Sequence, residues 1–317
     1  MKKVLSILLV LMMVAGLFGV ATASAPADKT YTIGMSQCNL GEPWRVAMNA
    51  QIAAAAKNYP MFNVVYADAA QDNSKQIADI QNFIQMGVDL LITSPNEDVP
   101  LTDVIKQAYD SGIPVILLDR RIIGDSYTQF IGADNKLIGE ECGKYVAEKL
   151  LPNGGKICMI KGLEGTSAGA DRDSGFRAGI AGNPKCEIIA AQNADWLREK
   201  AITVAQDMLQ TNDQIDLFFG LNDPMAEGAY IAAQNLGREK DIMFVGVDGL
   251  PTPDGGIQSV IDGRLNLTMI YPTGGKEAID NAYALLVEGK TLEKNVTLGT
   301  QAVTPDNAAE LLKQFNG

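Results

Sequence analysis

Short apolar runs alternate with amphipathic segments of helical length along almost the whole chain. The apolar runs fall at residues 31–37, 62–67, 89–93, 113–118, 156–160, 187–191, 217–220, 242–247 and 265–271. Between them, apolar residues recur at helical spacing over segments such as 44–58, 74–86, 137–151, 199–209, 226–236 and 276–287. This alternation predicts parallel β-sheets with helices on both faces. The fold class it indicates is α/β, built from doubly wound parallel sheets.

The length of the chain favours two such sheets rather than one. Roughly 290 residues follow the N-terminal segment described below, which is more than a single core usually holds. A glycine-containing seam, Ile131-Gly132-Ala133-Asp134-Asn135, ends the fifth unit and precedes a new strand–helix series. We expect the chain to pass between two lobes at this seam.

The N-terminus has the pattern of a secretory signal peptide. Met1-Lys2-Lys3 precedes an apolar run over 4–20, and the small residues 21–25 follow it. The alternative is a permanent membrane anchor, but the run is short for the roughly 20 residues that a spanning helix needs. The first cysteine is Cys38, so a lipid-anchored mature end is not expected. We therefore predict a signal peptide over 1–25 and export to the periplasm.

Charge and composition exclude several classes of function. The formal net charge is −12 and becomes −14 when Lys2 and Lys3 are removed, and a surface this acidic repels phosphate backbones and anionic lipid. Nucleic acid is therefore not an expected partner. Histidine, the commonest general base and metal ligand, is absent. We predict neither a cofactor nor a metal site.

The four cysteines are too few and too scattered for a disulfide scaffold. Cys158 and Cys186 lie in two apolar runs that could be neighbouring strands. A bridge between them and buried free thiols both remain open, and we favour free thiols.

Polar and aromatic side chains gather just after the predicted strands. In open parallel sheets, a ligand lies outside the carboxyl ends of the strands, so these positions are the ones to inspect. The residues that follow the strands are Glu42, Trp44 and Arg45; Asn96; Asp119 and Arg120; Arg172; Asp195 and Trp196; Asn222 and Asp223; Asp248; and Tyr271.

This set suits the recognition of a neutral ring that carries many hydroxyl groups. Each hydroxyl both donates and accepts, so a carboxylate can take its proton while arginine or asparagine donates to its oxygen. Trp44 and Trp196, the only tryptophans in the chain, can offer flat apolar faces to the ring. The pattern therefore predicts a sugar-binding site.

Each of these residues also has a purely structural explanation. Trp44 could pack on the core, residues 119–121 could form a solvated charged turn, and Arg172 could lie on the surface. Asp195 and Asn222 could cap helices. Their joint occurrence at strand ends favours the site, because independent caps need not share one edge with both indoles.

At these residues the chain resembles the ribose-binding family of periplasmic sugar-binding proteins, which are type I periplasmic binding proteins. The likeness covers essentially all of the mature chain. It is carried by Ile33-Gly34-Met35-Ser36-Gln37, Glu42-Pro43-Trp44-Arg45, Pro114-Val115-Ile116-Leu117-Leu118-Asp119-Arg120, Gly132-Ala133-Asp134-Asn135, Gly165-Thr166-Ser167, Arg172, Gly175-Phe176, Ala194-Asp195-Trp196, Asn222-Asp223-Pro224-Met225-Ala226 and Val245-Gly246-Val247-Asp248-Gly249.

The resemblance implies two doubly wound lobes joined by a three-segment hinge. The chain would cross between lobes near Gly132, near Tyr271 and over 296–300. The first lobe would then hold residues 30–132 and 271–297, and the second lobe residues 133–270 and 298–317. It also implies that Trp44 and Trp196 stack on the ring, and that its hydroxyls bond to Asp119, Arg120, Arg172, Asn222 and Asp248.

Departures from the family pattern bear on the ligand. Ribose binders typically have Asn and two Phe where this chain has Glu42, Trp44 and Arg45. The Trp-Arg pair, with the segment 271–275, is similar to galactofuranose-binding relatives and fructose-sensing periplasmic domains. Tyr271 would replace a family Gln. The resemblance thus implies a pentose or a furanose-form hexose as ligand.

The family likeness further implies a monomer that is not an enzyme and that delivers its sugar to the membrane permease of an ABC transporter. A chemotaxis or two-component receptor is the alternative partner. An enzyme of the same fold class is a rival, but no G-x-G-x-x-G follows the first strand, and Ala284 stands where a phosphate loop ending in 289–291 needs its first glycine. A glycosidase could use Glu42 and Asp248, although we expect the three arginines to keep carboxylates ionised.

Overall fold

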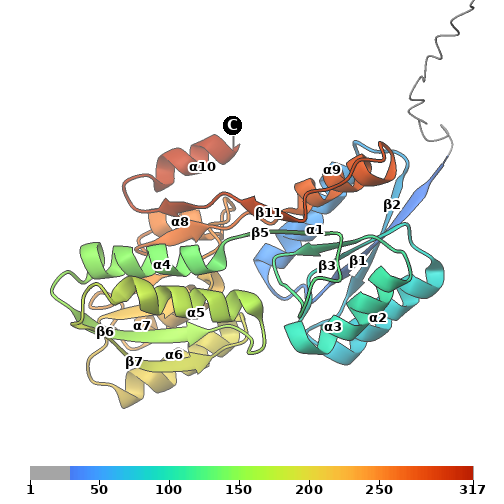
Figure 1. Ribbon diagram of the computed structural model, residues 1–317. Helices are drawn as coiled ribbons and strands as arrows, with labels where there is room; N and C mark the ends of the chain where they lie inside the picture. The colour runs from blue at the N-terminus through green and yellow to red at the C-terminus, as the bar shows by residue number, and fades with distance from the viewer. Residues whose placement is uncertain (1–28, 317) are drawn as a thin grey trace, which may run out of the picture.

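The computed structural model describes residues 29–316, so the signal peptide predicted over 1–25 lies outside the described residues. The described chain forms two α/β lobes that lie side by side (Figure 1). Within residues 29–316, we find no helix with the length and apolarity required to cross a membrane.

The first lobe contains a fully parallel six-stranded sheet in the order β11-β5-β4-β3-β1-β2. Its strands are β1 (Tyr31–Gln37), β2 (Phe62–Asp68), β3 (Leu90–Thr93), β4 (Val115–Leu118), β5 (Gln129–Ala133) and β11 (Asn295–Leu298). Its helices are α1 (Pro43–Ala56), α2 (Asn73–Met86), α3 (Asp98–Asp110) and α9 (Gly275–Leu286). Helices α1 and α9 pack together on one face of the sheet, and α2 and α3 on the other (Figure 1).

The second lobe repeats the plan with a four-stranded parallel sheet in the order β7-β6-β8-β9. Its strands are β6 (Gly155–Lys161), β7 (Cys186–Asn193), β8 (Leu217–Gly220) and β9 (Met243–Val245), and β10 (Thr268–Ile270) pairs antiparallel with β12 (Gln301–Val303). Its helices are α4 (Asn135–Tyr145), α5 (Ser167–Ile180), α6 (Arg198–Thr211), α7 (Asp223–Asn235), α8 (Gly256–Ile261) and α10 (Ala308–Asn316). The two-lobed, doubly wound α/β class predicted from the sequence is confirmed.

Three connections join the lobes: β5 to α4, β10 to α9, and β11 to β12. After the second, α9 packs against α1 of the first lobe; after the third, α10 packs against α8 of the second. Parallel strands in both sheets point their carboxyl ends toward these connections. The residues that follow the strands of both lobes therefore face one another.

Two predicted elements differ from the structure. The helix predicted over 137–151 is wrong as a single helix, because α4 ends at Tyr145 and continues as a π-helical turn, Val146–Leu150. The strand predicted over 265–271 is shortened to β10, because Asn266 bonds to Phe244 outside the regular ladder. Apolar periodicity reports burial and does not define where a hydrogen-bond ladder begins or ends.

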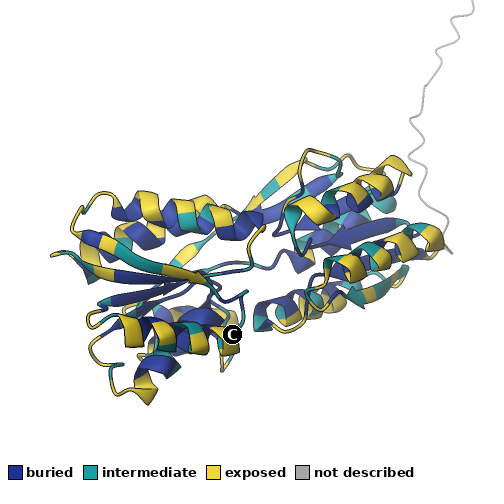
Figure 2. Cartoon of the chain, turned by 90° about the horizontal axis from the view of Figure 1, so that it is seen from below, coloured by how far each residue is buried: buried dark blue, intermediate teal, exposed yellow. Residues whose placement is uncertain are grey.

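The core of each lobe lies around its central strands, which are dark blue in Figure 2. Strands β3, β4 and β8 are buried throughout, as the continuous apolar runs of a sheet covered on both faces require. All four cysteines are buried free thiols. Cys158 pairs with Ala190 and Cys186 with Gly155 in the β6–β7 register, so the two thiols are not opposite one another.

Candidate functional site

A cavity of about 270 Å³ lies between the lobes at the carboxyl ends of both sheets. Nine of the eleven site residues predicted from the sequence line it; the exceptions are Asn96 and Arg120. Its lining consists of Glu42, Trp44, Arg45, Asp119, Ala168, Arg172, Trp196, Asn222, Asp248 and Tyr271. Ala168 was not predicted.

The first lobe contributes a paired set of charges. Arg45 Nη2 donates to Asp119 Oδ2 at 2.6 Å, and Arg45 Nη1 donates to Ser94 Oγ at 2.8 Å. Glu42 lies 4.0 Å from Arg45 Nε. Burial of Asp119 opposes its ionisation, but the charges of Arg45, Arg120 and Arg172 outweigh burial and lower the pKa of this carboxyl below its ordinary value. Asp119 is therefore held as a carboxylate.

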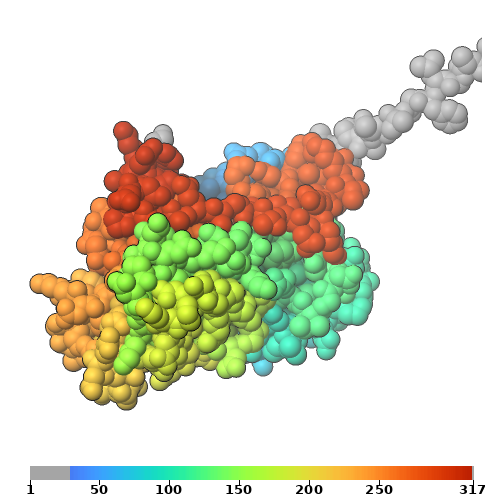
Figure 3. All heavy atoms as spheres, turned by 60° about the vertical axis from the view of Figure 1, so that its left-hand side comes forward, coloured from blue at the N-terminus to red at the C-terminus, as the bar shows by residue number. Residues whose placement is uncertain are grey.

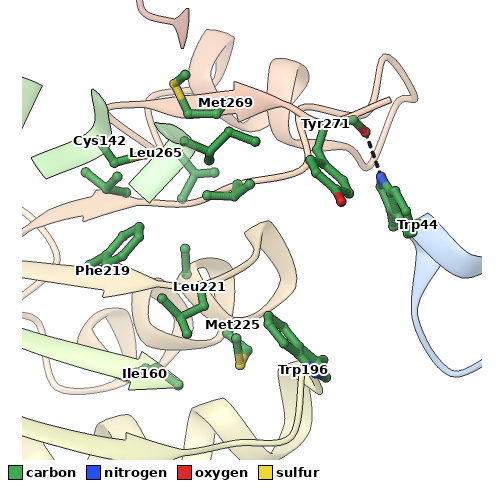
Figure 4. Close-up of a cluster of buried hydrophobic side chains, with 14 of the residues drawn as sticks. Trp44, Cys142, Ile160, Trp196, Phe219, Leu221, Met225, Leu265, Met269 and Tyr271 are labelled. Atoms are coloured by element: carbon green, nitrogen blue, oxygen red, sulfur yellow. Dashed lines mark hydrogen bonds between the residues drawn. The ribbon is translucent and has the colours of Figure 1, made fainter. Parts of the chain in front are cut away.

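Trp44 and Tyr271 meet at one wall of the cavity (Figure 4). Trp44 Nε1 donates to the Tyr271 carbonyl at 2.8 Å, and the two rings lie 5.1 Å apart between centroids. The Tyr271 hydroxyl donates to Asp119 Oδ1 at 2.6 Å. Trp44 is thus anchored by its nitrogen and is more than a core residue at the start of α1.

Arg172 is the cation of the second lobe, and it is buried rather than on the surface. Its Nη1 donates to the Leu221 carbonyl at 2.7 Å and its Nε to Asn135 Oδ1 at 2.8 Å. Helix α5 carries it, and α4 packs so closely against α5 that a Cβ on Gly139 would overlap the Arg172 carbonyl. This contact between helix backbones fixes the depth of the guanidinium.

Trp196 forms a flat wall on the side of the second lobe. Its indole lies against Gly162, where an added Cβ would overlap the ring carbons. The backbone is left-handed at Asp195 (φ 53°) and Trp196 (φ 70°), which aims the side chain into the cavity. Asn222 Nδ2 donates to the Trp196 carbonyl at 3.1 Å. Among residues 29–316, Trp196 Nε1 has no hydrogen-bond partner.

Asp248 contrasts with Asp119. Burial raises its pKa well above the ordinary value, and the nearby Asp223 adds to the rise, while Arg172 opposes it from 3.9 Å. Within the described chain, its carboxylate accepts no hydrogen bond from a protein donor. The raised pKa of Asp248 runs against the expectation that the arginines keep every carboxylate ionised, because Arg172 pairs with Asp248 only at 3.9 Å, without a hydrogen bond.

Asn96 and Arg120 lie behind the cavity lining. Arg120 Nη1 donates to the Asn96 carbonyl at 2.8 Å, and Asn96 Nδ2 donates to Asn73 Oδ1 at 2.9 Å. Arg120 is 1% exposed, and its Cζ lies 5.7 Å from the Trp196 ring. The turn 119–121 is thus not solvated at its first two residues.

The predicted helix caps divide between two outcomes. Asn222 caps α7 by accepting from the Met225 N–H at 2.9 Å and also lines the cavity, so both explanations hold for it. Asp195 does not cap a helix: its carboxylate pairs with Lys200 at 2.7 Å, away from the cavity lining.

Hydrogen bonds also join the two lobes directly, between residues that do not line the cavity. The Asp98 N–H donates to the Gly165 carbonyl at 2.9 Å, and the Ser167 N–H donates to Asp98 Oδ1 at 3.2 Å. Elsewhere, Gln71 Nε2 donates to the Asp195 carbonyl at 3.0 Å. The lobes are therefore closed on one another, and the cavity is enclosed between them.

A second, larger hollow of about 1610 Å³ lies on the hinge side, between α1, α9 and α10 (Figure 3). Of the predicted site residues, only Asp248 and Tyr271 reach it. The charged and aromatic side chains converge on the smaller cavity, which we take as the candidate site.

Sequence reasoning did not identify the roles of Asn135 and Gly162, which position Arg172 and Trp196. Asn135 ends the seam 131–135, and its amide could have been noticed there as a polar residue at a crossing. Gly162 follows β6 directly, and no local pattern distinguishes it from an ordinary loop glycine.

Comparison with known proteins agrees with this geometry. Residues 33–291 match the model of a family described as a periplasmic binding protein domain. The chain is 33% identical to the ribose import binding protein of Bacillus subtilis (strain 168), covering 85% of this chain and 86% of that protein. It is 29% identical to the galactofuranose-binding protein of Escherichia coli (strain K12), covering 93% and 94%.

Among solved structures, the fructose-binding periplasmic domain of a hybrid two-component system superposes with a TM-score of 0.87 at 40% identity, covering 90% of this chain and 94% of that one. A galactofuranose-binding protein superposes with a TM-score of 0.84 at 28% identity, covering 90% and 98%. The chain therefore belongs to the periplasmic binding protein family, in the type I sugar-binding group that includes the ribose import binding proteins.

Proposed function

We propose that this protein is the solute-binding component of an ABC sugar importer and that it binds one monosaccharide, a pentose or a furanose-form hexose. The observation that carries the proposal is the convergence of acids, arginines, an amide and two indoles from both lobes on one enclosed cavity. The names of the relatives support this ligand class, since they specify ribose, galactofuranose and fructose. The lining side chains leave little space between the closed lobes, which favours a single sugar ring over a larger ligand.

The side chains divide the recognition of the ring between them. Trp44 and Trp196 offer their faces to its C–H surfaces. Hydrogen bonds to its hydroxyls come from Glu42, Arg45, Asp119, Arg172, Asn222, Asp248 and Tyr271, and Asn96 and Arg120 support the site from behind the lining. Micromolar affinity requires about 8 kcal/mol in total, so each bond needs only a modest net gain over water.

Hinge closure follows from the placement of the site between lobes. We assign residues 30–132 and 271–297 to the first lobe and residues 133–270 and 298–317 to the second. A sugar that contacts both lobes favours the closed arrangement by its differential affinity for the two states. The closed surface then serves as the signal that a membrane permease recognises. We further propose export through the signal peptide 1–25, a monomeric state and no catalytic activity.

Calorimetric titration and thermal shift of the mature chain test the proposal. The sugars are D-ribose, D-fructose, D-galactose, L-arabinose, D-allose and myo-inositol. A ligand that binds only the folded state at 100 times its Kd stabilises the protein by about 2.7 kcal/mol and raises its Tm. Recovery of the sugar unchanged after prolonged incubation supports binding without turnover, whereas a product would indicate an enzyme.

A matched pair of arginines on α5 provides the control. We expect Arg172→Ala to abolish the shift, since it removes a buried guanidinium that lines the cavity. Arg177 lies on the same helix, is exposed and pairs with Asp173, so Arg177→Ala should keep the shift. Equal shifts in both variants, or no shift with any sugar in the wild type, would contradict the proposal.

A sensory role is the second candidate, and one observation favours it: the match to a periplasmic domain of a hybrid two-component system. Deletion of the gene separates the two roles. Loss of uptake of the labelled sugar supports import, whereas unchanged uptake with a lost transcriptional or chemotactic response supports sensing.

A further inference from the structure

Asn135 does not line the cavity, yet it connects two residues that do. It lies in the first turn of α4, directly after the chain has passed from β5 to the second lobe, and is 4% exposed. Its Oδ1 accepts from Arg172 Nε at 2.8 Å, and its Nδ2 donates to the Tyr271 hydroxyl at 3.2 Å. Both ends of the amide are therefore used.

The bonds form a directed series across the molecule. Arg172 donates to Asn135, Asn135 donates to Tyr271, and the Tyr271 hydroxyl donates to Asp119 Oδ1 at 2.6 Å. Burial, followed by the charge of Asp119, raises the pKa of Tyr271 well above its ordinary value, so the hydroxyl keeps the proton that it donates. The series thus runs from a cation of the second lobe to a carboxylate of the first.

The series also passes through two of the three connections between lobes. Asn135 follows the β5–α4 connection, and Tyr271 begins the β10–α9 connection. Opening of the hinge must therefore rearrange it, and closing assembles it. Buried hydrogen bonds that donate in the same direction polarise one another, so the loss of one hydrogen bond of the series weakens the others.

We propose that Asn135 is a positioning residue that couples the charged groups of the two lobes and thereby sets sugar affinity. A primary amide can accept from a guanidinium and donate to a hydroxyl at the same time, whereas a carboxylate can only accept and an alkyl group can do neither. The inference rests on the proposed function, because sugar affinity is what the series serves.

The closing experiment measures the Kd of each sugar in the panel above that binds the wild type. Asn135→Asp keeps an oxygen that accepts from Arg172, but it replaces the NH2 group that donates to the Tyr271 hydroxyl with a second acceptor oxygen. This oxygen competes with Asp119 for the proton of the hydroxyl. We expect a loss of affinity of roughly tenfold, as for one mismatched buried hydrogen bond. Asn135→Ala, which removes both bonds, should lose more.

A double-mutant cycle with Tyr271→Phe separates positioning from general destabilisation. If Asn135 acts through the Tyr271 hydroxyl, Asn135→Asp should cost less than about twofold once that hydroxyl is absent. Asn212 is the control: it lies in the same lobe and, among residues 29–316, its side chain bonds to Met208 and Thr211 beside it, so Asn212→Ala should keep wild-type affinity. Circular dichroism confirms that each variant is folded.

The outcomes are distinct. Wild-type affinity in Asn135→Asp, or a loss that adds fully to that of Tyr271→Phe, overturns this inference and leaves the proposed function intact. A wild-type chain that binds no sugar overturns both. Should Asn135→Ala fail to fold, the isosteric Asn135→Asp still decides the question.

Discussion

Two aspartates occupy matching places in the two lobes, but their hydrogen bonding and the direction of their pKa shifts are opposite. Asp119 follows β4 and Asp248 follows β9. Each donates its N–H to the carbonyl of a residue in another strand, Ile131 of β5 and Met269 of β10, and each has a positive φ, 66° and 137° respectively. Asp119 receives hydrogen bonds from Arg45 and Tyr271, and the charges of Arg45, Arg120 and Arg172 lower its pKa despite its burial. Asp248 has its nearest cation, Arg172, at 3.9 Å and a raised pKa.

The difference shows that the two lobes can contribute differently to ligand binding: one carboxyl is bonded within the protein, and the other is left for the ligand. In the first-lobe half, protein donors already bond the Asp119 carboxylate, although Arg45 Nε and Arg120 Nη2 have no hydrogen-bond partner among residues 29–316. The second-lobe half retains an acid without a protein donor and an indole N–H without an acceptor among residues 29–316. A hydrogen bond from a hydroxylated ligand contributes most to binding at groups that the protein leaves unpaired, because no internal hydrogen bond has to be broken to form it.

The largest expected effect comes from Asp119→Asn. Removal of this charge leaves Arg45 buried without its carboxylate, and breaking a buried pair costs about 3–5 kcal/mol. We expect this drop in the free energy of unfolding in urea at neutral pH, with the sugar-induced thermal shift lost. The matched variant Asp248→Asn should change the free energy of unfolding by less than about 1 kcal/mol, because no protein donor depends on that carboxylate. Equal losses in the two variants would abolish the contrast.

The next effect concerns affinity. Asp248→Asn replaces one carboxyl oxygen that faces the sugar with an amide NH2, and leaving a buried polar group mismatched costs about 1–3 kcal/mol. We expect the Kd to rise roughly tenfold to a hundredfold, as measured by calorimetry. An unchanged Kd would show that the ligand does not use this acid.

A smaller effect should follow from Gly162→Ala. The new methyl group overlaps the Trp196 indole and must displace it, and overpacking of this kind costs about 1–3 kcal/mol. We expect a roughly tenfold weaker Kd together with a changed tryptophan emission spectrum, since Trp44 and Trp196 are the only tryptophans. Gly182→Ala, at a position with open space around it, is the control and should change neither quantity.

Measured per pH unit, the smallest effect is the dependence of stability on pH. Burial raises the pKa of Asp223, which lies beside Asp248, to about 7. Between its ordinary value of 3.8 and this value, the native state binds more protons than the unfolded state, so the free energy of unfolding falls as pH rises through this window. One group contributes a slope of up to about 1.4 kcal/mol per pH unit.

Asp119 has the opposite sign. Its pKa is lowered, so its contribution is present above the ordinary value of 3.8 and is lost as pH falls below it. Urea unfolding at a series of pH values checks both windows. Asp223→Asn should flatten the slope near neutral pH and leave the acid limb in place; a slope that survives this substitution would assign it to other groups.

Much of the site could be predicted because strand ends are visible in the sequence. Trp44, Arg172 and Asn222 follow apolar runs, and the rule that ligands lie outside the carboxyl ends of parallel strands placed them at the correct edge. Asn96 and Arg120 also follow strands, but they lie behind the residues that line the cavity. A position after a strand does not specify whether the side chain reaches the cavity. Gly162 was missed because its role depends on the indole that lies over it.

By itself, the sequence determined the α/β class, the division into two lobes, the burial of the strands and the group of residues that could meet a ligand. Local apolar periodicity carries this information, since burial repeats with the pitch of a helix or strand. Only the tertiary structure decided that Asp119 is paired and Asp248 is not, and that Asn135 joins Arg172 to Tyr271. These outcomes depend on distances and desolvation among residues as far as 152 positions apart, and no local pattern encodes them.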